Sequence, residues 1–160
     1  MSARTINLTV NGEPVSATVE ARRNLVDFLR EDLELTGSHV GCEHGVCGAC
    51  TIRVNGDIVR GCLMLAVQVD GARVETIEGL SDSGEVADLQ AAFVERNAAQ
   101  CGFCTPGMLM AAADLLGTTP GASRDEIREH ISGNYCRCTG YQAIVDAIET
   151  TGKARQGGAS

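Results

Sequence analysis

The sequence predicts an α+β fold, in which a small mixed β-sheet with one helix is followed by a purely helical segment. Residues 5–20 and 51–77 alternate apolar and polar side chains around Asn-Gly and Asp-Gly pairs, which is typical of short strands joined by tight turns. From about residue 87 the apolar residues recur every three or four positions, as they do on one face of an amphipathic helix. The cysteines divide equally between the two segments.

The first segment opens with a predicted hairpin, because Asn11–Gly12 lies in the middle of residues 5–20 and suits a type I′ turn. Residues 24–33 then predict an amphipathic helix, since its leucines and Phe28 share one face. The chain continues as a glycine-rich loop over 36–50, a second hairpin with Asn55–Gly56 at its tip, and two short strands about Asp70–Gly71.

Beyond residue 79 the strand pattern stops, and the polar stretch 81–85 predicts a joint. Helices are then expected over 87–99, from Thr105 to Leu116, from a capping box at Ser123–Glu126 to Gly133, and from a second capping box at Thr139–Gln142 onward. Four helices suffice for a small bundle.

The length of 160 residues suits one large domain or two small ones, and the composition permits a core. Apolar residues make up 44% of the 160 residues, but aromatic residues only 3%, so the eight cysteines are the candidate centres around which the chain orders. The expected division is a domain over 1–77, a linker over 78–86, a helical domain over 87–152 and a polar tail over 153–160.

Charge and hydropathy exclude several classes of partner. The formal net charge is -8 and no block of Lys or Arg occurs, which argues against nucleic acid or an anionic membrane surface as the partner. No apolar run is long enough to span a bilayer, and no apolar export signal is present. We therefore expect a cytoplasmic protein whose cysteines are metal ligands or redox groups, because disulfides are rare in that compartment.

The first four cysteines predict an iron–sulfur centre. Their spacing is C-x4-C-x2-C-x11-C, and plant-type [2Fe–2S] sites show C-x4-C-x2-C with a later fourth ligand. Three ligands on one loop require sharp turns, and inward-facing amides of such a loop can donate to anionic sulfur. The ligand candidates are Cys42, Cys47, Cys50 and Cys62, and the glycines that permit the turns are Gly41, Gly45 and Gly48.

Two alternatives for this first set fit less well. Zinc held by four thiolates usually shows two short C-x2-C knuckles, whereas here four residues separate one pair and eleven the other. His44 invites a Rieske interpretation, but no second His-containing ligand pair follows it. We interpret His44, His39 and His130 as ordinary residues outside the metal site.

The second set consists of two pairs, CGFC at Cys101 and Cys104 and CRC at Cys136 and Cys138. Each pair directly precedes a predicted helix, whose N-terminus favours thiolate and an anionic cluster. Spacing alone leaves three interpretations open: an iron–sulfur cluster, a zinc site, and a redox dithiol at Cys101 and Cys104 that leaves the other pair unused.

The stretches GCEHGVCGACT, QCGFCTPGM and NYCRCTGYQ together resemble the small iron–sulfur subunit of the molybdenum hydroxylases, the xanthine oxidase family. The resemblance runs from the first hairpin to about Ile148 and includes all eight expected cysteines. It implies an N-terminal ferredoxin-like β-grasp domain with a plant-type [2Fe–2S] cluster, and a C-terminal four-helix-bundle domain with a second [2Fe–2S] cluster. The length resembles that of the separate small subunit of heterotrimeric members.

The same resemblance implies partners and further cofactors. A large subunit would bind molybdopterin and a medium subunit FAD, in an expected dimer of heterotrimers. Electrons would pass singly from molybdenum through the helical-domain cluster and the β-domain cluster to the flavin. Gln100 and Cys138 are carried over from the family as expected contacts to the pterin.

No candidate site for bond-making chemistry emerges from the sequence, since the histidines are scattered and no cysteine is left over as a nucleophile. We therefore predict electron transfer, as a subunit of an oxidoreductase that is not catalytic alone. The alternative is a free-standing ferredoxin-like carrier with two clusters. Residues 1–77 would satisfy it, but a carrier does not need the helical domain.

Overall fold

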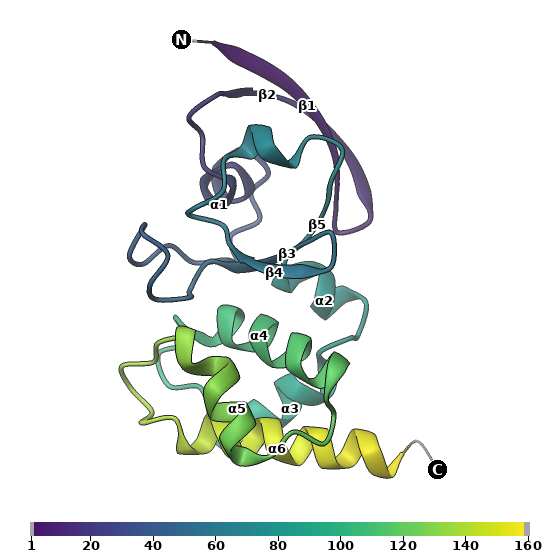
Figure 1. The fold of residues 1–160 in the computed structure, drawn as a ribbon, viewed down its shortest axis with the longest axis vertical. Helices are drawn as coiled ribbons and strands as arrows, with labels where there is room; N and C mark the ends of the chain where they lie inside the picture. The colour runs from purple at the N-terminus through teal and green to yellow at the C-terminus, as the bar shows by residue number, and fades with distance from the viewer. Residues whose placement is uncertain (1, 159–160) are drawn as a thin grey trace.

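The computed structural model describes residues 2–158, which form a sheet half and a helical half stacked on one another (Figure 1). The five strands are ordered β2-β1-β5-β3-β4, with β1 parallel to β5 and the other pairs antiparallel. Helix α4 packs on β3 and β4, and α6 lies at the far end of the molecule (Figure 1). The predicted α+β class is confirmed.

Both predicted hairpins form. The first joins β1 (Ala3–Val10) to β2 (Glu13–Glu20), and the second joins β3 (Thr51–Val54) to β4 (Asp57–Arg60). Both residues of each tip have positive φ, for example 50° at Asn11 and 85° at Gly12, as a type I′ turn requires.

The connection before the last strand differs from the prediction. Only one strand forms near Asp70, namely β5 (Arg73–Glu75), and the preceding segment is a 3₁₀ turn, η2 (Ala66–Val69). Ala66 and Val69 are both fully buried, and residues three apart lie on one side of a 3₁₀ turn. A strand would place Ala66 and Val69 on opposite faces, so the burial of both residues requires the tighter 3₁₀ turn.

The predicted helix over 24–33 forms in two short parts, α1 (Leu25–Asp27) and a π-helical turn, η1 (Phe28–Asp32). Asn24 caps the start, because its side-chain oxygen accepts a hydrogen bond from the amide of Asp27 at 2.8 Å. Phe28 and Leu29 are fully buried against the sheet.

The helical half contains α2 (Ile77–Asp82), α3 (Ala87–Glu95), α4 (Thr105–Thr118), α5 (Arg124–His130), the 3₁₀ turn η3 (Ile131–Gly133) and α6 (Gln142–Gly157). Residues 78–86, expected as a linker, include most of α2, whose Leu80 packs into the helical core. Helix α6 continues into the expected tail, where Arg155 pairs with Asp88 on α3. Residues 1, 159 and 160 lie outside the described residues.

Two separate hydrophobic cores result. The core of the sheet half gathers around Phe28, Ile52 and Val74, and the core of the helical half gathers around Phe93 and Met108. Among residues 2–158, no helix combines the length and the apolar character needed to cross a membrane. A polar junction between the two cores joins the first cysteine loop to the segment just ahead of Cys136.

Candidate metal centres

The first cysteine loop directs backbone amides at sulfur. The N–H groups of Val46 and Cys47 both donate to Cys42 Sγ, each at 3.3 Å, and that of Ala49 donates to Cys47 Sγ at 3.5 Å. Several N–H groups converging on a sulfur favour its anionic form. The loop predicted from glycine content therefore has the expected inward-facing amides.

The three predicted glycines are needed for close approach as well as for turning. Gly45 and Gly48 have φ of 81° and 75°. A Cβ on Gly45 would overlap the side chain of Leu63, and one on Gly48 would stand 2.5 Å from the carbonyl oxygen of Gly133. A Cβ on Gly41 would stand 3.1 Å from the nearest thiol sulfur, so the loop has no room for side chains beside the sulfurs.

The first four thiols lie within reach of one another. Cys42 interacts with Cys47, and Cys50 interacts with both Cys62 and Cys47. The amide of Cys47, followed by that of His44, lowers the pKa of the Cys42 thiol to about 6. Burial, followed by the neighbouring thiols, raises the pKa of Cys50 to about 11. The Cys42 sulfur therefore favours the thiolate state, whereas burial favours the neutral thiol at Cys50.

The second set meets as two pairs, Cys101 with Cys138 and Cys104 with Cys136. Cys138 Sγ lies 3.5 Å from Cys101 Sγ, and both residues are exposed. Burial first, and then the neighbouring Cys136, raises the pKa of Cys104 to about 12. Beside Cys104, the Thr105 hydroxyl oxygen is buried and has no hydrogen-bond partner.

The predicted helix N-terminus after Cys101 and Cys104 is confirmed, whereas the one predicted directly after Cys136 and Cys138 is wrong. Cys104 is the residue before α4, with proline in the first turn of that helix. Helix α6 begins only at Gln142, so Cys136 and Cys138 lie in an irregular segment ahead of it, and Thr139 does not cap a helix.

The junction between the halves brings the two sets together through contacts that sequence reasoning missed. Asn134 is buried, and its side-chain amide donates to the carbonyl of Gly48 at 3.1 Å and to Thr51 Oγ1 at 3.2 Å. The next amide, that of Tyr135, donates to the carbonyl of Cys47 at 2.8 Å. One hydrogen bond therefore connects a cysteine of the first set to the residue preceding Cys136.

The histidines and Gln100 lie outside both thiol sets. His39 stacks on Phe103 with ring centroids 4.8 Å apart, and its Nδ1 lies 2.7 Å from the Phe103 carbonyl oxygen, so it joins the two halves. His44 is exposed on the first loop, and Gln100 is exposed next to the second set. Within residues 2–158, no three side chains of His, Cys, Asp or Glu converge on the position of a single ion.

Two sets of four neighbouring thiols, the first with converging amides, fit a group that takes four thiolates on two metals. A [2Fe–2S] cluster has this requirement, since four cysteine thiolates hold two irons. All eight cysteines are free thiols and so are available as ligands.

Comparison with known proteins tests the same interpretation. Residues 8–78 match the family described as 2Fe-2S iron-sulfur cluster binding domain, and residues 76–149 match the family described as [2Fe-2S] binding domain. The caffeine dehydrogenase subunit gamma of Pseudomonas sp. (strain CBB1) is 54% identical, over 94% of this chain and 92% of its own length. This chain belongs to the small iron–sulfur subunits of the molybdenum hydroxylases.

Other members of the family agree in sequence and in structure. The nicotine 6-hydroxylase small subunit of Paenarthrobacter nicotinovorans is 53% identical, over 89% of this chain and 86% of its own length. A chain of quinoline 2-oxidoreductase from Pseudomonas putida 86 superposes with a TM-score of 0.92 at 48% identity, covering 100% of both chains. The iron–sulfur subunit described here therefore carries two [2Fe–2S] domains.

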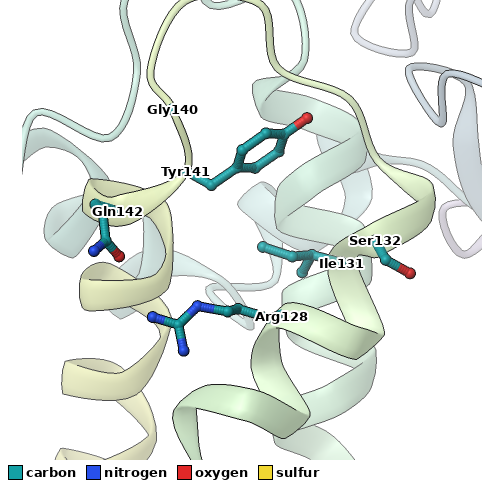
Figure 2. A pocket seen from close by; sticks show the side chains of 6 residues that line it. All are labelled: Arg128, Ile131, Ser132, Gly140, Tyr141 and Gln142. Carbon is teal, nitrogen blue, oxygen red and sulfur yellow. The ribbon is translucent and has the colours of Figure 1, made fainter.

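An open hollow of about 570 Å³ lies at the start of α6 in this iron–sulfur subunit. Figure 2 shows its lining, in which the Tyr141 ring extends from the start of α6 toward the segment that carries Ile131. The lining residues are Arg128, Ile131, Ser132, Gly140, Tyr141 and Gln142.

Proposed function

We propose that this chain is the electron-transfer subunit of a heterotrimeric molybdenum hydroxylase, relaying electrons singly between a molybdopterin subunit and an FAD subunit. The observation that carries the proposal is the meeting of the eight thiols in two sets of four, in a member of this family. Substrate oxidation releases two electrons, and two one-electron centres in series separate them.

The two clusters are assigned to the two cysteine sets. When bound, each [2Fe–2S] cluster accepts and returns one electron at a time. The chain's own groups supply the ligands and the amide donors that stabilise negative charge on sulfur. The first cluster is held by Cys42, Cys47, Cys50 and Cys62, and the second by Cys101, Cys104, Cys136 and Cys138.

The junction provides the connection between the centres. The hydrogen bond from the Tyr135 amide to the Cys47 carbonyl places a peptide of the second ligand segment directly on a ligand residue of the first. Asn134 holds this contact by its two hydrogen bonds to the sheet half. The rigid junction keeps the distance between the centres constant, on which single-electron transfer depends.

We assign one partner subunit to each of two exposed faces. Cys101, Cys138 and Gln100 are exposed, and this face is assigned to the molybdopterin subunit, with Gln100 and Cys138 against the pterin. Val46 and Leu63 leave 44% and 62% of their surface exposed beside the first set, and this face is assigned to the FAD subunit. Exposed apolar side chains of this size are typical of protein interfaces.

The domain division and assembly complete the proposal. The ferredoxin-like domain over 1–77 and the helical domain over 87–152, joined by 78–86 and followed by a tail over 153–160, are supported by the two separate cores. A four-helix bundle of α3, α4, α5 and α6 is supported by the contacts α3 with α6, α5 with α6 and α4 with α5. We assign a dimer of heterotrimers in the cytoplasm, a compartment that keeps free thiols reduced.

The first test is the cofactor content of the complex purified from its native cells. The proposal expects about four Fe with one Mo and one FAD per copy of this chain, together with two larger chains, since two [2Fe–2S] centres hold four irons. Four Fe without Mo, flavin or partners would instead establish a free-standing carrier, and zinc in place of iron would overturn both.

A matched pair of variants tests the first ligand set. Cys42→Ser should remove the first cluster and stop reduction of the flavin by substrate, while molybdenum is still reduced. His44→Ala, two residues away on the same loop, should retain both clusters, because only the His44 backbone faces the Cys42 sulfur. Wild-type flavin reduction in Cys42→Ser, or equal iron loss in His44→Ala, would contradict the assignment.

A further inference from the structure

Thr139 occupies an unexpected place in the second thiol segment. The sequence predicts that its hydroxyl caps a helix, but α6 begins at Gln142 and its first turn has no side-chain cap. The Thr139 hydroxyl oxygen lies instead 3.0 Å from Cys136 Sγ, in a partly buried position. The Thr139 hydroxyl therefore interacts with the Cys136 sulfur and not with a helix end.

The neighbouring hydrogen bonds determine which atom is the donor. The backbone amide of Tyr141 donates to Thr139 Oγ1 at 3.2 Å, so the hydroxyl oxygen already serves as an acceptor and its hydrogen is free to point at Cys136 Sγ. The Tyr141 hydroxyl in turn accepts a hydrogen bond from the Cys136 amide at 2.9 Å. These three bonds form a closed loop around a single thiol.

Tyr141, which takes part in two of these hydrogen bonds, has a strained backbone conformation. Its φ is 70°, in the left-handed region that a bulky side chain rarely adopts. Such strain persists only where the surroundings determine the conformation, and it concentrates at functional sites. Figure 2 shows the Tyr141 ring directed across the hollow, away from the axis of α6.

Cys136 differs from the other cysteines in this respect. Within residues 2–158, the hydrogen bonds to the other cysteine sulfurs come from backbone amides or from another thiol, and only Cys136 receives one from a hydroxyl. A hydrogen bond donated to a thiolate sulfur stabilises the negative charge on that sulfur. The hydroxyl therefore stabilises negative charge on this sulfur.

We propose that Thr139 tunes the reduction potential of the second cluster through its hydrogen bond to Cys136 Sγ, and that Tyr141 is a positioning residue that holds Thr139 there. The inference rests on the proposed assignment of Cys136 as a cluster ligand. Reduction adds one negative charge to a cluster, and a hydrogen bond to a ligand sulfur stabilises that charge. The bond therefore raises the potential and makes this centre a better acceptor.

The test is a redox titration of the intact complex followed by electron paramagnetic resonance, in which the signal lost in Cys42→Ser identifies the first cluster. Thr139→Val removes the hydroxyl at nearly constant shape. It should lower the equilibrium constant for reducing the second cluster by up to about tenfold, or about 59 mV for one electron. Thr139→Ser, which keeps the hydroxyl, should match the parent, and the first cluster should not shift in either variant.

A double variant tests the role of Tyr141. Tyr141→Phe removes the hydroxyl that accepts from Cys136 and should lower the same potential by less than Thr139→Val does. Added to Thr139→Val it should change nothing further, because the Tyr141 hydroxyl affects the sulfur only by holding the Cys136 backbone where Cys136 Sγ can accept from Thr139. A further shift of the same size would overturn the positioning role.

The remaining outcomes separate the inference from the proposed function. An unchanged potential in Thr139→Val, or equal shifts in Thr139→Val and Thr139→Ser, overturns the tuning role alone. Loss of the cluster in both Thr139→Val and Thr139→Ala also overturns it, since the hydroxyl would then be required for assembly. Absence of a second cluster from the parent complex overturns the inference together with the proposed function.

Discussion

Replacing Asn134 by alanine removes the side chain that fastens the second ligand segment to the sheet half. Its amide nitrogen donates two hydrogen bonds, to Gly48 and Thr51, its oxygen accepts a longer one from Arg60 at 3.5 Å, and only 3% of its surface is exposed. Each of the two shorter bonds contributes about 0.5–1.5 kcal/mol net, so their loss costs about 1–3 kcal/mol. In a chain of this size a loss of about 2 kcal/mol lowers the melting temperature by about 4–8 °C.

Two measurements check this prediction. Thermal unfolding of the chain with its clusters, followed by circular dichroism and by visible absorption, gives the change in melting temperature. The magnetic interaction between the two reduced clusters reports the distance between them, and it should weaken as the junction loosens. The control is Gln90→Ala, which removes one side-chain hydrogen bond, to Ser81, entirely within the helical half.

Comparison of Asn134→Ala with Gln90→Ala shows whether Asn134 holds the two halves together. Gln90→Ala should lower stability slightly and leave the cluster interaction unchanged, because its bond does not cross the junction. If Asn134→Ala keeps both the wild-type melting temperature and the wild-type cluster interaction, Asn134 does not hold the centres together. A weaker magnetic interaction between the clusters in both variants would instead show that the whole structure has loosened.

Three further changes have expected outcomes. Gly48→Ala should lower the free energy of unfolding by at least about 1–2 kcal/mol and should also reduce the iron content. The control Gly12→Ala, at positive φ but in open space, should lower the free energy of unfolding without loss of iron. Equal iron loss in both variants would contradict the prediction. Asp88→Asn removes the partner of Arg155, whose guanidinium lowers the pKa of Asp88 below its ordinary value of 3.8. The free energy of unfolding, measured by urea denaturation, should fall by about 0.5–1 kcal/mol above about pH 5, and this loss should shrink only as the pH falls below 3.8. A loss that grows in acid would refute the pairing. Cys138→Ala should alter the spectrum of the second cluster and loosen the pterin, and unchanged spectra and turnover would remove that assignment.

The sequence was informative wherever the determining contacts are local. Asn11–Gly12 predicts its hairpin because only two adjacent residues need positive φ. The C-x4-C-x2-C spacing with its glycines predicts a loop whose amides face sulfur, and Val46 and Cys47 donate as expected. These features depend on neighbouring residues, so a local pattern suffices.

Local patterns failed where a distant contact chose the conformation. The first of the two strands predicted about Asp70–Gly71 became a 3₁₀ turn because Ala66 and Val69 both face the sheet core. The linker became α2 because Leu80 has the helical core to pack against. Thr139 has the sequence context of a helix cap, but the Cys136 sulfur and the Tyr141 amide bind its hydroxyl instead.

The sequence by itself determined the ligand type, the division into two cysteine sets and the family resemblance, because cysteine identity and short spacing record them directly. Only the tertiary structure decided how the two sets meet. The contacts of Asn134 with Gly48 and of Tyr135 with Cys47 join residues more than eighty positions apart, and no local period specifies them. Their geometry follows from two separately folded cores docking through a buried polar junction.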